Sequence, residues 1–305
     1  MKKRSEKLSK QLRDRVDMGI LINSSTKVIV QGITGREGSF HTEQMAAYGT
    51  QIVAGVSPQK GGSWVLDGKI PVFDTMQAAM EVTEANASII FVPARNATDA
   101  LFEAADSGVE LVVCITEGVP VQDVVKVCQY MSNRGVRLVG PNCSGIINPG
   151  EAKLGVAPSD CVIPGKVGVI SRSGTLSYLV MSEMKSRGIG VSTCIGIGGD
   201  IVQGTTFVEA LELFETDPYT ERILLIGEVG GLEEERAASY VAYKMTKPVT
   251  ALLVGKTAPQ GKKMGHSGAF IEAGIGGIDS KIEAFESVGV RVVTDIKEVP
   301  DALQG

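Results

Sequence analysis

Short apolar runs rich in β-branched residues alternate with stretches of helical periodicity along almost the whole chain. Ten of these runs predict β-strands, at residues 27–32, 51–56, 88–93, 111–116, 136–142, 166–171, 192–198, 223–229, 248–255 and 290–295. Runs that are apolar on both faces are typical of parallel strands covered by helices on each side of the sheet. The pattern therefore predicts an α/β protein with two doubly wound domains.

A long aperiodic stretch separates the two sets of strands. Residues 148–166, NPGEAKLGVAPSDCVIPGK, are rich in proline and glycine, which is typical of a connection between domains. We expect a first domain over 21–150 and a second over 151–305. Ligands of open parallel sheets bind beyond the carboxyl ends of the strands, so the residues that follow each strand are the candidates for chemistry.

Composition narrows the kinds of partner. The 305 residues carry a formal net charge of −5, which gives no bulk reason to expect a nucleic acid or an anionic membrane. No apolar run reaches the roughly 18 residues of a membrane-spanning helix.

The cysteines are Cys114, Cys128, Cys143, Cys161 and Cys194. Since they have neither CxxC nor zinc-ligand spacing, we expect free, mostly buried thiols in a reducing compartment and no metal site.

The first residues, MKKRSEKLSKQLRDRVDMG, are basic but differ from targeting sequences. They lack the apolar segment of a secretory signal, and their acidic residues argue against a mitochondrial transit peptide. Leu8, Leu12 and Val16 recur at helical spacing. We expect residues 1–20 to be a basic extension with a short amphipathic helix that docks on the protein body or on a partner.

A glycine-rich turn follows the first predicted strand. Gly32, Gly35 and Gly38 have the spacing G-x-x-G-x-x-G ahead of a helical stretch. Such a turn lets a phosphate approach the backbone N–H groups and the positive end of the helix, although a tight turn without a ligand is the alternative. A nicotinamide dinucleotide site has G-x-G-x-x-G and an acidic residue after the second strand, whereas Lys60 follows that strand here. A lysine favours a phosphate on the ribose, which both coenzyme A (CoA) and NADP carry.

The chain has two histidines in different settings. His41 lies one turn into the first helical stretch without an evident partner acid, so we interpret it as structural. His266 lies in GKKMGHSGAF, shortly after the strand at 248–255, where Gly265 and Gly268 leave it little to pack against. A neutral imidazole in such a loop is a good nucleophile or base near neutral pH.

Two further strand ends carry candidate chemistry. Glu228 closes an otherwise apolar strand, where a carboxylate is costly unless it is paired. One use is to hold an imidazole through Nδ1–H and leave Nε2 free; a solvated strand-end carboxylate is the alternative. Ser173, Gly174 and Thr175 open a helix after the strand at 166–171, which suits either an anion site or an ordinary N-cap.

From about residue 20 to its end, the chain resembles the α subunits of the succinyl-CoA synthetase (succinate–CoA ligase) family. The resemblance rests on QGITGREGSFH, GVSPQKGG, ITEGVP, GPNCSGIINPGE, PGKVGVISRSGTLSY, IGIGGD, IGEVGG and GKKMGHSGA, which occur in the family's order. It implies a Rossmann-like CoA-binding domain followed by a flavodoxin-like ligase domain. The activity it implies is the reversible formation of succinyl-CoA from succinate, CoA and ATP or GTP through a phosphohistidine.

The resemblance also implies roles for individual residues. His266 corresponds to the histidine that is transiently phosphorylated, and Glu228 to the acid that hydrogen-bonds to it. Residues 173–175 correspond to the start of a helix that cradles the histidine phosphate, and Tyr178 to a position of the acid-substrate site. The positions that correspond to the CoA site are Thr34, Gly35, Arg36, Glu37, Lys60, Ile115, Thr116 and Glu117.

A partner subunit follows from the same resemblance. In the family a second phosphate-cradling helix, the ATP or GTP site and its magnesium belong to an ATP-grasp β subunit, in αβ or α2β2 assemblies. The present chain has no G-x-x-x-x-G-K-[ST] loop of its own. We expect a cytoplasmic enzyme, or one of the mitochondrial matrix if the source is eukaryotic.

Two loops depart from the family pattern. Ser144 stands where proline is common, and Ile201, Val202 and Gln203 replace a frequent Pro-Ile-Pro. Both loops border the implied acid-substrate pocket, so malate or citrate is an alternative to succinate. A non-catalytic CoA-binding module and an NADP-dependent dehydrogenase are further alternatives. The joint presence of the histidine, its acid and the SRSGT turn argues against the former, and the glycine spacing against the latter.

Overall fold

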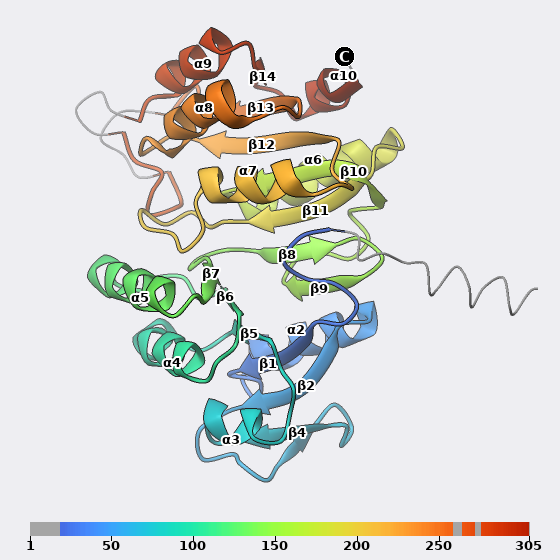
Figure 1. Cartoon of the computed structure of the whole chain (residues 1–305), viewed down its shortest axis with the longest axis vertical. Helices are drawn as coiled ribbons and strands as arrows, with labels where there is room; N and C mark the ends of the chain where they lie inside the picture. The colour runs from blue at the N-terminus through green and yellow to red at the C-terminus, as the bar shows by residue number, and fades with distance from the viewer. Residues whose placement is uncertain (1–18, 259–263, 272–275, 305) are drawn as a thin grey trace, which may run out of the picture.

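The computed structural model describes residues 19–258, 264–271 and 276–304. Its strands form two seven-stranded sheets, one above the other in Figure 1. The amphipathic helix expected around Leu8, Leu12 and Val16 lies outside the described residues. Within the described part of the chain, no helix has both the length and the apolar character needed to cross a membrane.

The first sheet has the strand order of a Rossmann domain. Its strands are β1 (Lys27–Gln31), β2 (Gln51–Val56), β3 (Trp64–Val65), β4 (Ile70–Phe73), β5 (Ala87–Ile90), β6 (Leu111–Cys114) and β7 (Arg137–Val139), in the order β3-β4-β2-β1-β5-β6-β7. The strands from β4 to β7 are parallel, and β3 adds an antiparallel edge. The order reverses at β1, which makes the turn after β1 the expected ligand position.

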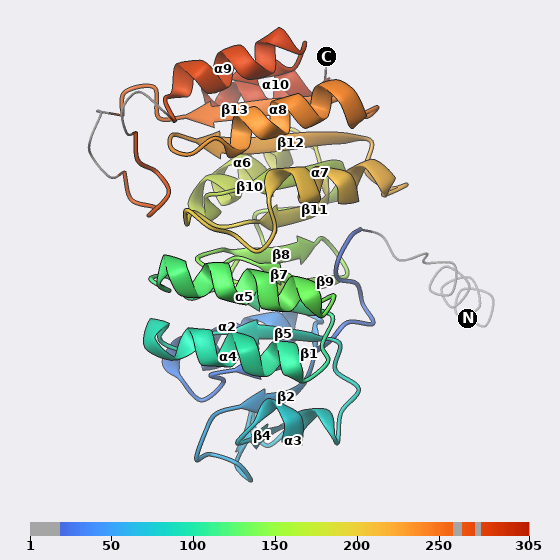
Figure 2. The same ribbon diagram turned by 60° about the vertical axis from the view of Figure 1, so that its left-hand side comes forward.

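Helices cover both faces of this sheet. They are α2 (Arg36–Tyr48), α3 (Met76–Met80), α4 (Ala94–Asp106) and α5 (Val121–Asn133). The apolar sides of α3, α4 and α5 pack on one face, in a cluster that contains Ile29, Leu101 and Val127. Helix α2 lies on the opposite face, as Figure 2 shows, where Met45 packs with Val30.

The second sheet has a flavodoxin-like core with an added hairpin. Its strands are β8 (Gly145–Asn148), β9 (Ala152–Gly155), β10 (Pro164–Ser171), β11 (Val191–Gly196), β12 (Arg222–Glu228), β13 (Val249–Val254) and β14 (Arg291–Val293), in the order β14-β13-β12-β10-β11-β8-β9. The five strands from β10 to β14 are parallel and run in the flavodoxin order, with the switch point between β10 and β12. Strands β8 and β9 are antiparallel.

The helices of the second domain also divide between two faces. They are α6 (Gly174–Ser186), α7 (Phe207–Thr216), α8 (Glu233–Lys244), α9 (Ile278–Ser287), the 3-10 helix η1 (Ile296–Glu298) and α10 (Val299–Gln304). Helices α6 and α10 share one apolar cluster with β10, whereas α7, α8 and α9 contribute to another. Figures 1 and 2 show these two groups on opposite sides of the sheet.

All ten predicted strands are confirmed, and four others were not predicted. Strands β3 and β4 are short, and β8 and β9 lie in or beside the stretch predicted as an aperiodic connection. The chain passes from the first sheet to the second between Val139 and Gly145, earlier than the predicted division at residue 150. The reason is that β8 pairs with β11 of the second sheet, while Ile146 and Leu154 of the hairpin are buried in an apolar cluster that also contains Val28 of the first sheet.

The hairpin also joins the two halves of the molecule. Thr50, just before β2, donates its hydroxyl to the carbonyl of Lys153 at 2.7 Å and accepts the Lys153 N–H at 3.0 Å. The largest apolar cluster includes residues of both sheets. The two domains therefore share part of their core.

Candidate active site

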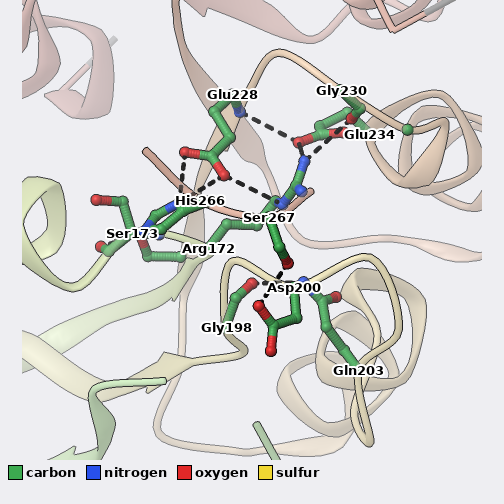
Figure 3. Close-up of polar contacts among 12 residues, drawn as sticks. Arg172, Ser173, Gly198, Asp200, Gln203, Glu228, Gly230, Glu234, His266 and Ser267 are labelled. Carbon is green, nitrogen blue, oxygen red and sulfur yellow. Dashed lines mark hydrogen bonds and ion pairs between the residues drawn. The ribbon is translucent and has the colours of Figure 1, made fainter. Parts of the chain in front are cut away.

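Glu228 and His266 meet at the carboxyl edge of the second sheet. Glu228 is the last residue of β12, and His266 lies in the connection that follows the neighbouring parallel strand β13. The His266 Nδ1 atom is 2.8 Å from Glu228 Oε1 and 3.0 Å from Oε2. Figure 3 shows the two carboxylate oxygens directed at the imidazole. Adjacent parallel strands thus bring together two side chains that are 38 residues apart.

The carboxylate fixes the chemistry of the imidazole. A carboxylate accepts hydrogen bonds, so Nδ1 carries the proton and the neutral ring keeps its lone pair on Nε2. The hydrogen bond that Glu228 accepts raises the pKa of His266 above its usual 6.5. Burial and Arg172 oppose this rise, and Asp200 adds to it. The arrangement orients a nucleophilic nitrogen and stabilises the imidazolium.

The imidazole packs more closely than the sequence indicates. A Cβ atom on Gly199 would lie only 2.2 Å from Cγ of His266, so the ring rests on bare backbone that only glycine provides. Gly268 N–H also donates to the Gly199 carbonyl at 2.9 Å. The expectation that His266 has little to pack against is wrong, because Gly199 comes from a different strand connection, after β11.

The start of α6 faces the histidine across a cavity of about 350 Å³. Ser173 is the N-cap of this helix, and its hydroxyl accepts the Leu176 N–H at 3.3 Å. Ser173, Leu176, Glu228 and His266 all line the cavity. The first N–H groups of a helix have no carbonyl partner within it, so they and the helix dipole suit an anion beside the imidazole.

Tyr178 lies one turn further along α6, next to Ser144. A Cβ atom on Gly174 would contact both side chains, 3.1 Å from Ser144 Cβ and 3.3 Å from the Tyr178 hydroxyl. Burial raises the pKa of Tyr178, and a side-chain hydrogen bond with Ser144 partly offsets this. Tyr178 is therefore a neutral phenol, and the serine that departs from the family pattern is its partner.

A buried charged network behind the histidine was not predicted. Arg172, which precedes the N-cap of α6, lies 3.6 Å through Nε from Glu228 Oε1 and 3.2 Å through Nη1 from Glu234 Oε1. Lys281 of α9 in turn contacts Glu234. A signal was present in the sequence, since Arg172 is the charged residue of the SRSGT turn. Its ion-pair partners come from the end of β12 and from one later helix, α8, which no local pattern reveals.

The predicted CoA positions lie at the carboxyl edge of the first sheet. Those from Thr34 to Glu37 follow β1, Lys60 follows β2, and those from Ile115 to Glu117 follow β6. Gly35 is the N-cap of α2, and the exposed Arg36 extends from its first turn. Lys60 is exposed as well. The turn after β1 thus presents a helix start and nearby cations to one edge, which suits a phosphate-bearing ligand.

Their local contacts explain why these turns hold their shape. The Thr34 hydroxyl and the Ser57 hydroxyl are 3.0 Å apart, which ties the turn after β1 to the one after β2. Thr116 donates its hydroxyl to the carbonyl of Val92 at 2.7 Å.

His41 stacks on Phe91, and burial lowers the pKa of His41. A packed ring agrees with the structural interpretation of His41.

The cysteine thiols belong to no group of side chains that could bind a metal ion in the described part of the chain. All five cysteines are free, and four are buried, as predicted. Burial raises the pKa of Cys114 and of Cys194 to about 12, so these are unreactive thiols. Among the described residues, no group of three or more His, Cys, Asp and Glu side chains is placed to hold a metal ion.

Comparison with known proteins decides the family. The CoA binding domain model matches residues 23–118, and the CoA-ligase model matches residues 170–291. The chain is 52% identical over 288 residues to the succinate–CoA ligase [ADP-forming] subunit alpha of Aquifex aeolicus, covering 94% of each chain. It belongs to the succinate–CoA ligase α-subunit family. A second member, subunit alpha 2 of Archaeoglobus fulgidus, is 51% identical over 284 residues, which cover 93% of this chain and 98% of that one.

The fold of this family member is also found in a more distant protein. ATP citrate lyase from Methanothrix soehngenii, solved in complex with citrate and coenzyme A, superposes with a TM-score of 0.82 at 22% identity. The superposition covers 93% of this chain and 51% of the lyase chain, so the present chain spans about half of that structure. At this identity the likeness shows the fold alone.

The family matches confirm the resemblance and the fold class inferred from the sequence, and the chain is part of an enzyme.

Proposed function

We propose that this protein is the α subunit of an NTP-dependent acid–CoA ligase. The reaction is the reversible formation of succinyl-CoA from succinate, CoA and ATP or GTP through phosphorylation of His266. The observation that carries the proposal is the hydrogen bond between Nδ1 of His266 and the Glu228 carboxylate, which lies beside the start of α6. Because this hydrogen bond places the proton on Nδ1, Nε2 keeps the lone pair and is the nucleophile. The curated relatives are succinate–CoA ligase α subunits, which supports succinate as the acid.

The geometry supports a relay of three steps. Nε2 of His266 attacks the γ-phosphorus of the nucleotide, the bond to the β-phosphate breaks, and the nucleoside diphosphate leaves. A carboxylate oxygen of succinate then takes the phosphoryl group, which gives an acyl phosphate and restores the imidazole. The thiolate of CoA attacks the acyl carbon and displaces inorganic phosphate. Glu228 stabilises the positive charge that the ring develops in the first step, and the start of α6 stabilises the phosphoryl oxygens.

We assign the remaining predicted residues to the two substrates. The turn from Thr34 to Glu37 and the segment from Ile115 to Glu117 hold CoA at the carboxyl edge of the first sheet. Lys60 pairs with the ribose phosphate, as its exposure at that edge allows. Tyr178 contributes to the acid pocket from the same helix that cradles the phosphate.

We assign nucleotide and magnesium binding to a β partner of the ATP-grasp type. The subunit names of the relatives support a partner, and a phosphohistidine needs more donors than one helix start supplies. The interface then lies around the start of α6 and the His266 loop. Free, mostly buried thiols support a reducing compartment, and we propose the cytoplasm.

The test is to assay the chain alone and together with a β subunit of the same family. With labelled ATP or GTP we expect acid-labile phosphate on this chain only when the partner is present. We also expect acyl-CoA formation to be fastest with succinate among succinate, malate and citrate. Full activity of the chain alone would overturn the two-subunit proposal. CoA binding without phosphorylation in the complex would favour a non-catalytic CoA module.

A further inference from the structure

Arg172 is a buried cation that lies between two buried carboxylates. Its side chain is 4% exposed, and those of Glu228 and Glu234 are 10% and 0% exposed. Its Nη1 donates to the carbonyl of Gly230 at 3.1 Å and to Glu234 Oε1 at 3.2 Å. Figure 3 shows the guanidinium between the two acids, with one Glu228 oxygen joined by dashed lines to both Arg172 and His266. A buried charge is tolerated only when it is paired, so these contacts fix the position of Arg172.

Glu234 has a second cation of its own. Lys281, which is fully buried, donates to Glu234 and also to Glu235 at 3.1 Å. The N–H of Glu228 donates to Glu234 Oε1 at 3.1 Å. With Glu234 supported by these donors, the positive charge of Arg172 is available to Glu228. The order of charges is therefore Lys281, Glu234, Arg172, Glu228 and then the imidazole.

One donor of Arg172 remains unused in this arrangement. Its Nε–H is buried and has no hydrogen-bond partner within the described residues. It lies 3.6 Å from Glu228 Oε1, beyond hydrogen-bond distance but close enough for a strong charge interaction. A buried donor without a partner lowers the stability of the fold. The position of the Arg172 Nε–H next to Glu228 therefore does not serve stability, and an effect on the Glu228 carboxylate explains it better.

The guanidinium also touches the loop that carries the histidine. A Cβ atom on Gly268 would lie 2.5 Å from Nη2 of Arg172. Arg172 therefore contacts both the acid that orients His266 and the backbone two residues beyond it. A side chain at residue 268 would also meet the Gly199 carbonyl oxygen at 2.9 Å, so the space there suits glycine.

We propose that Arg172 is a positioning residue for His266, which holds the Glu228 carboxylate in place against Nδ1 and limits protonation of the imidazole. The proposal rests on the proposed function, in which Nε2 must carry a lone pair. Three charged groups of the described chain act on the ring: Glu228 at the end of β12, Asp200 after β11, and Arg172 after β10. The two carboxylates favour the imidazolium, and Arg172 opposes them. Without Arg172, the ring would hold a proton on Nε2 to a higher pH.

The test uses R172Q, R172M and R172K, with R187Q as a matched control. Arg187 is a half-exposed arginine at the other end of α6. The His266 pKa is measured by ¹⁵N NMR of the imidazole in the full chain, where His41 provides the only other histidine signal and H266A assigns the peaks. We expect R172Q and R172M to raise the His266 pKa by roughly one unit. R172K, which retains the charge, and R187Q should leave it near the wild-type value.

Kinetics of the chain with its β partner provide the second readout. We expect R172Q to slow phosphorylation at pH 7 by up to about tenfold, the limit that a one-unit shift sets, and to recover as the pH rises. An unchanged His266 pKa with an equal loss of rate at every pH would overturn the proposal and leave Arg172 a purely structural residue. The amide of R172Q can replace a donor to Gly230 or Glu234. If R172M does not fold, the His266 pKa and the pH profile of R172Q therefore test the proposal. Absence of phosphorylation in the wild-type complex would instead overturn the proposed function, while the NMR comparison still decides the role of Arg172.

Discussion

The carboxylate of Asp200 accepts a hydrogen bond from the Ser267 hydroxyl at 2.6 Å and another from the Asn142 side-chain amide at 3.0 Å. Ser267 is the neighbour of His266 in the chain. Asn142 follows the first sheet, and its backbone N–H donates to the carbonyl of Thr116 at 3.0 Å. A buried acid thus connects the predicted CoA edge to the histidine loop.

Replacing Asp200 tests this connection. Both hydrogen bonds end on Oδ1, so D200A leaves two half-buried donors without this partner, at a cost of about 1 kcal/mol each. We expect D200A to lower the melting temperature and to slow phosphorylation of His266. D200N retains an oxygen at Oδ1 and should keep more of both. Thermal unfolding and phosphate labelling of the complex check this, and equal behaviour of the two variants would contradict it.

His266 itself should be dispensable for folding. Its side chain is 27% exposed and packs mainly on glycine backbone. H266A should abolish acid-labile labelling while circular dichroism and CoA binding remain near wild type. H41A is the matched control, since His41 packs on Phe91 in the other domain, and it should still be labelled. Labelling of H266A at the wild-type level would remove His266 from the mechanism.

Phosphorylation should depend on pH through the raised pKa of His266. Since Nε2 reacts only when the ring is neutral, the wild-type rate should rise as the pH increases through a pKa above 6.5. Glu228 is the main cause of the raised pKa, so E228Q should move the midpoint down while it slows the reaction at high pH. Initial rates from pH 5.5 to 9 check this. An E228Q variant with reduced CoA affinity but normal phosphorylation would contradict the assignment.

The same pair should stabilise the fold in a defined pH range. A histidine whose pKa is higher in the folded state binds its proton more tightly there. Its stabilisation is therefore complete below about pH 6.5 and is lost as the pH rises through the folded-state pKa. We expect E228Q to lower the free energy of unfolding more at pH 5.5 than at pH 9. Urea titrations at the two values measure the difference, and a larger loss at pH 9 would contradict the prediction.

Lys60 should distinguish CoA from its dephosphorylated form. Loss of one charge-assisted contact weakens binding by on the order of ten- to a hundredfold. K60E should weaken CoA by this amount and dephospho-CoA much less, as measured by calorimetry. K126E on the exposed side of α5 is the control for net charge. Equal weakening of both ligands by K60E would contradict the assignment to the ribose phosphate.

The sequence by itself determined the parallel framework. Strands buried on both faces are nearly continuous apolar runs, such as those at 111–116 and 223–229, and this signal is local. Since chemistry follows strand ends in such sheets, Glu228, His266 and the helix start at Ser173 were all identified as candidates. The antiparallel hairpin of β8 and β9 gave no such signal, because its strands, GIIN and AKLG, contain glycine, asparagine and lysine and so are not continuous apolar runs.

Only the tertiary structure decided which side chains meet. Arg172 and Glu234 are 62 residues apart, and Lys281 and Glu234 are 47 apart, so neither pair leaves a pattern in any local window. The contact of His266 with Gly199 likewise depends on two strand connections that approach each other. Periodicity reports which face of an element is buried, whereas the pairing of buried charges depends on distances of a few ångströms between elements that are remote in the chain, and these arise only once the sheet and its helices are packed.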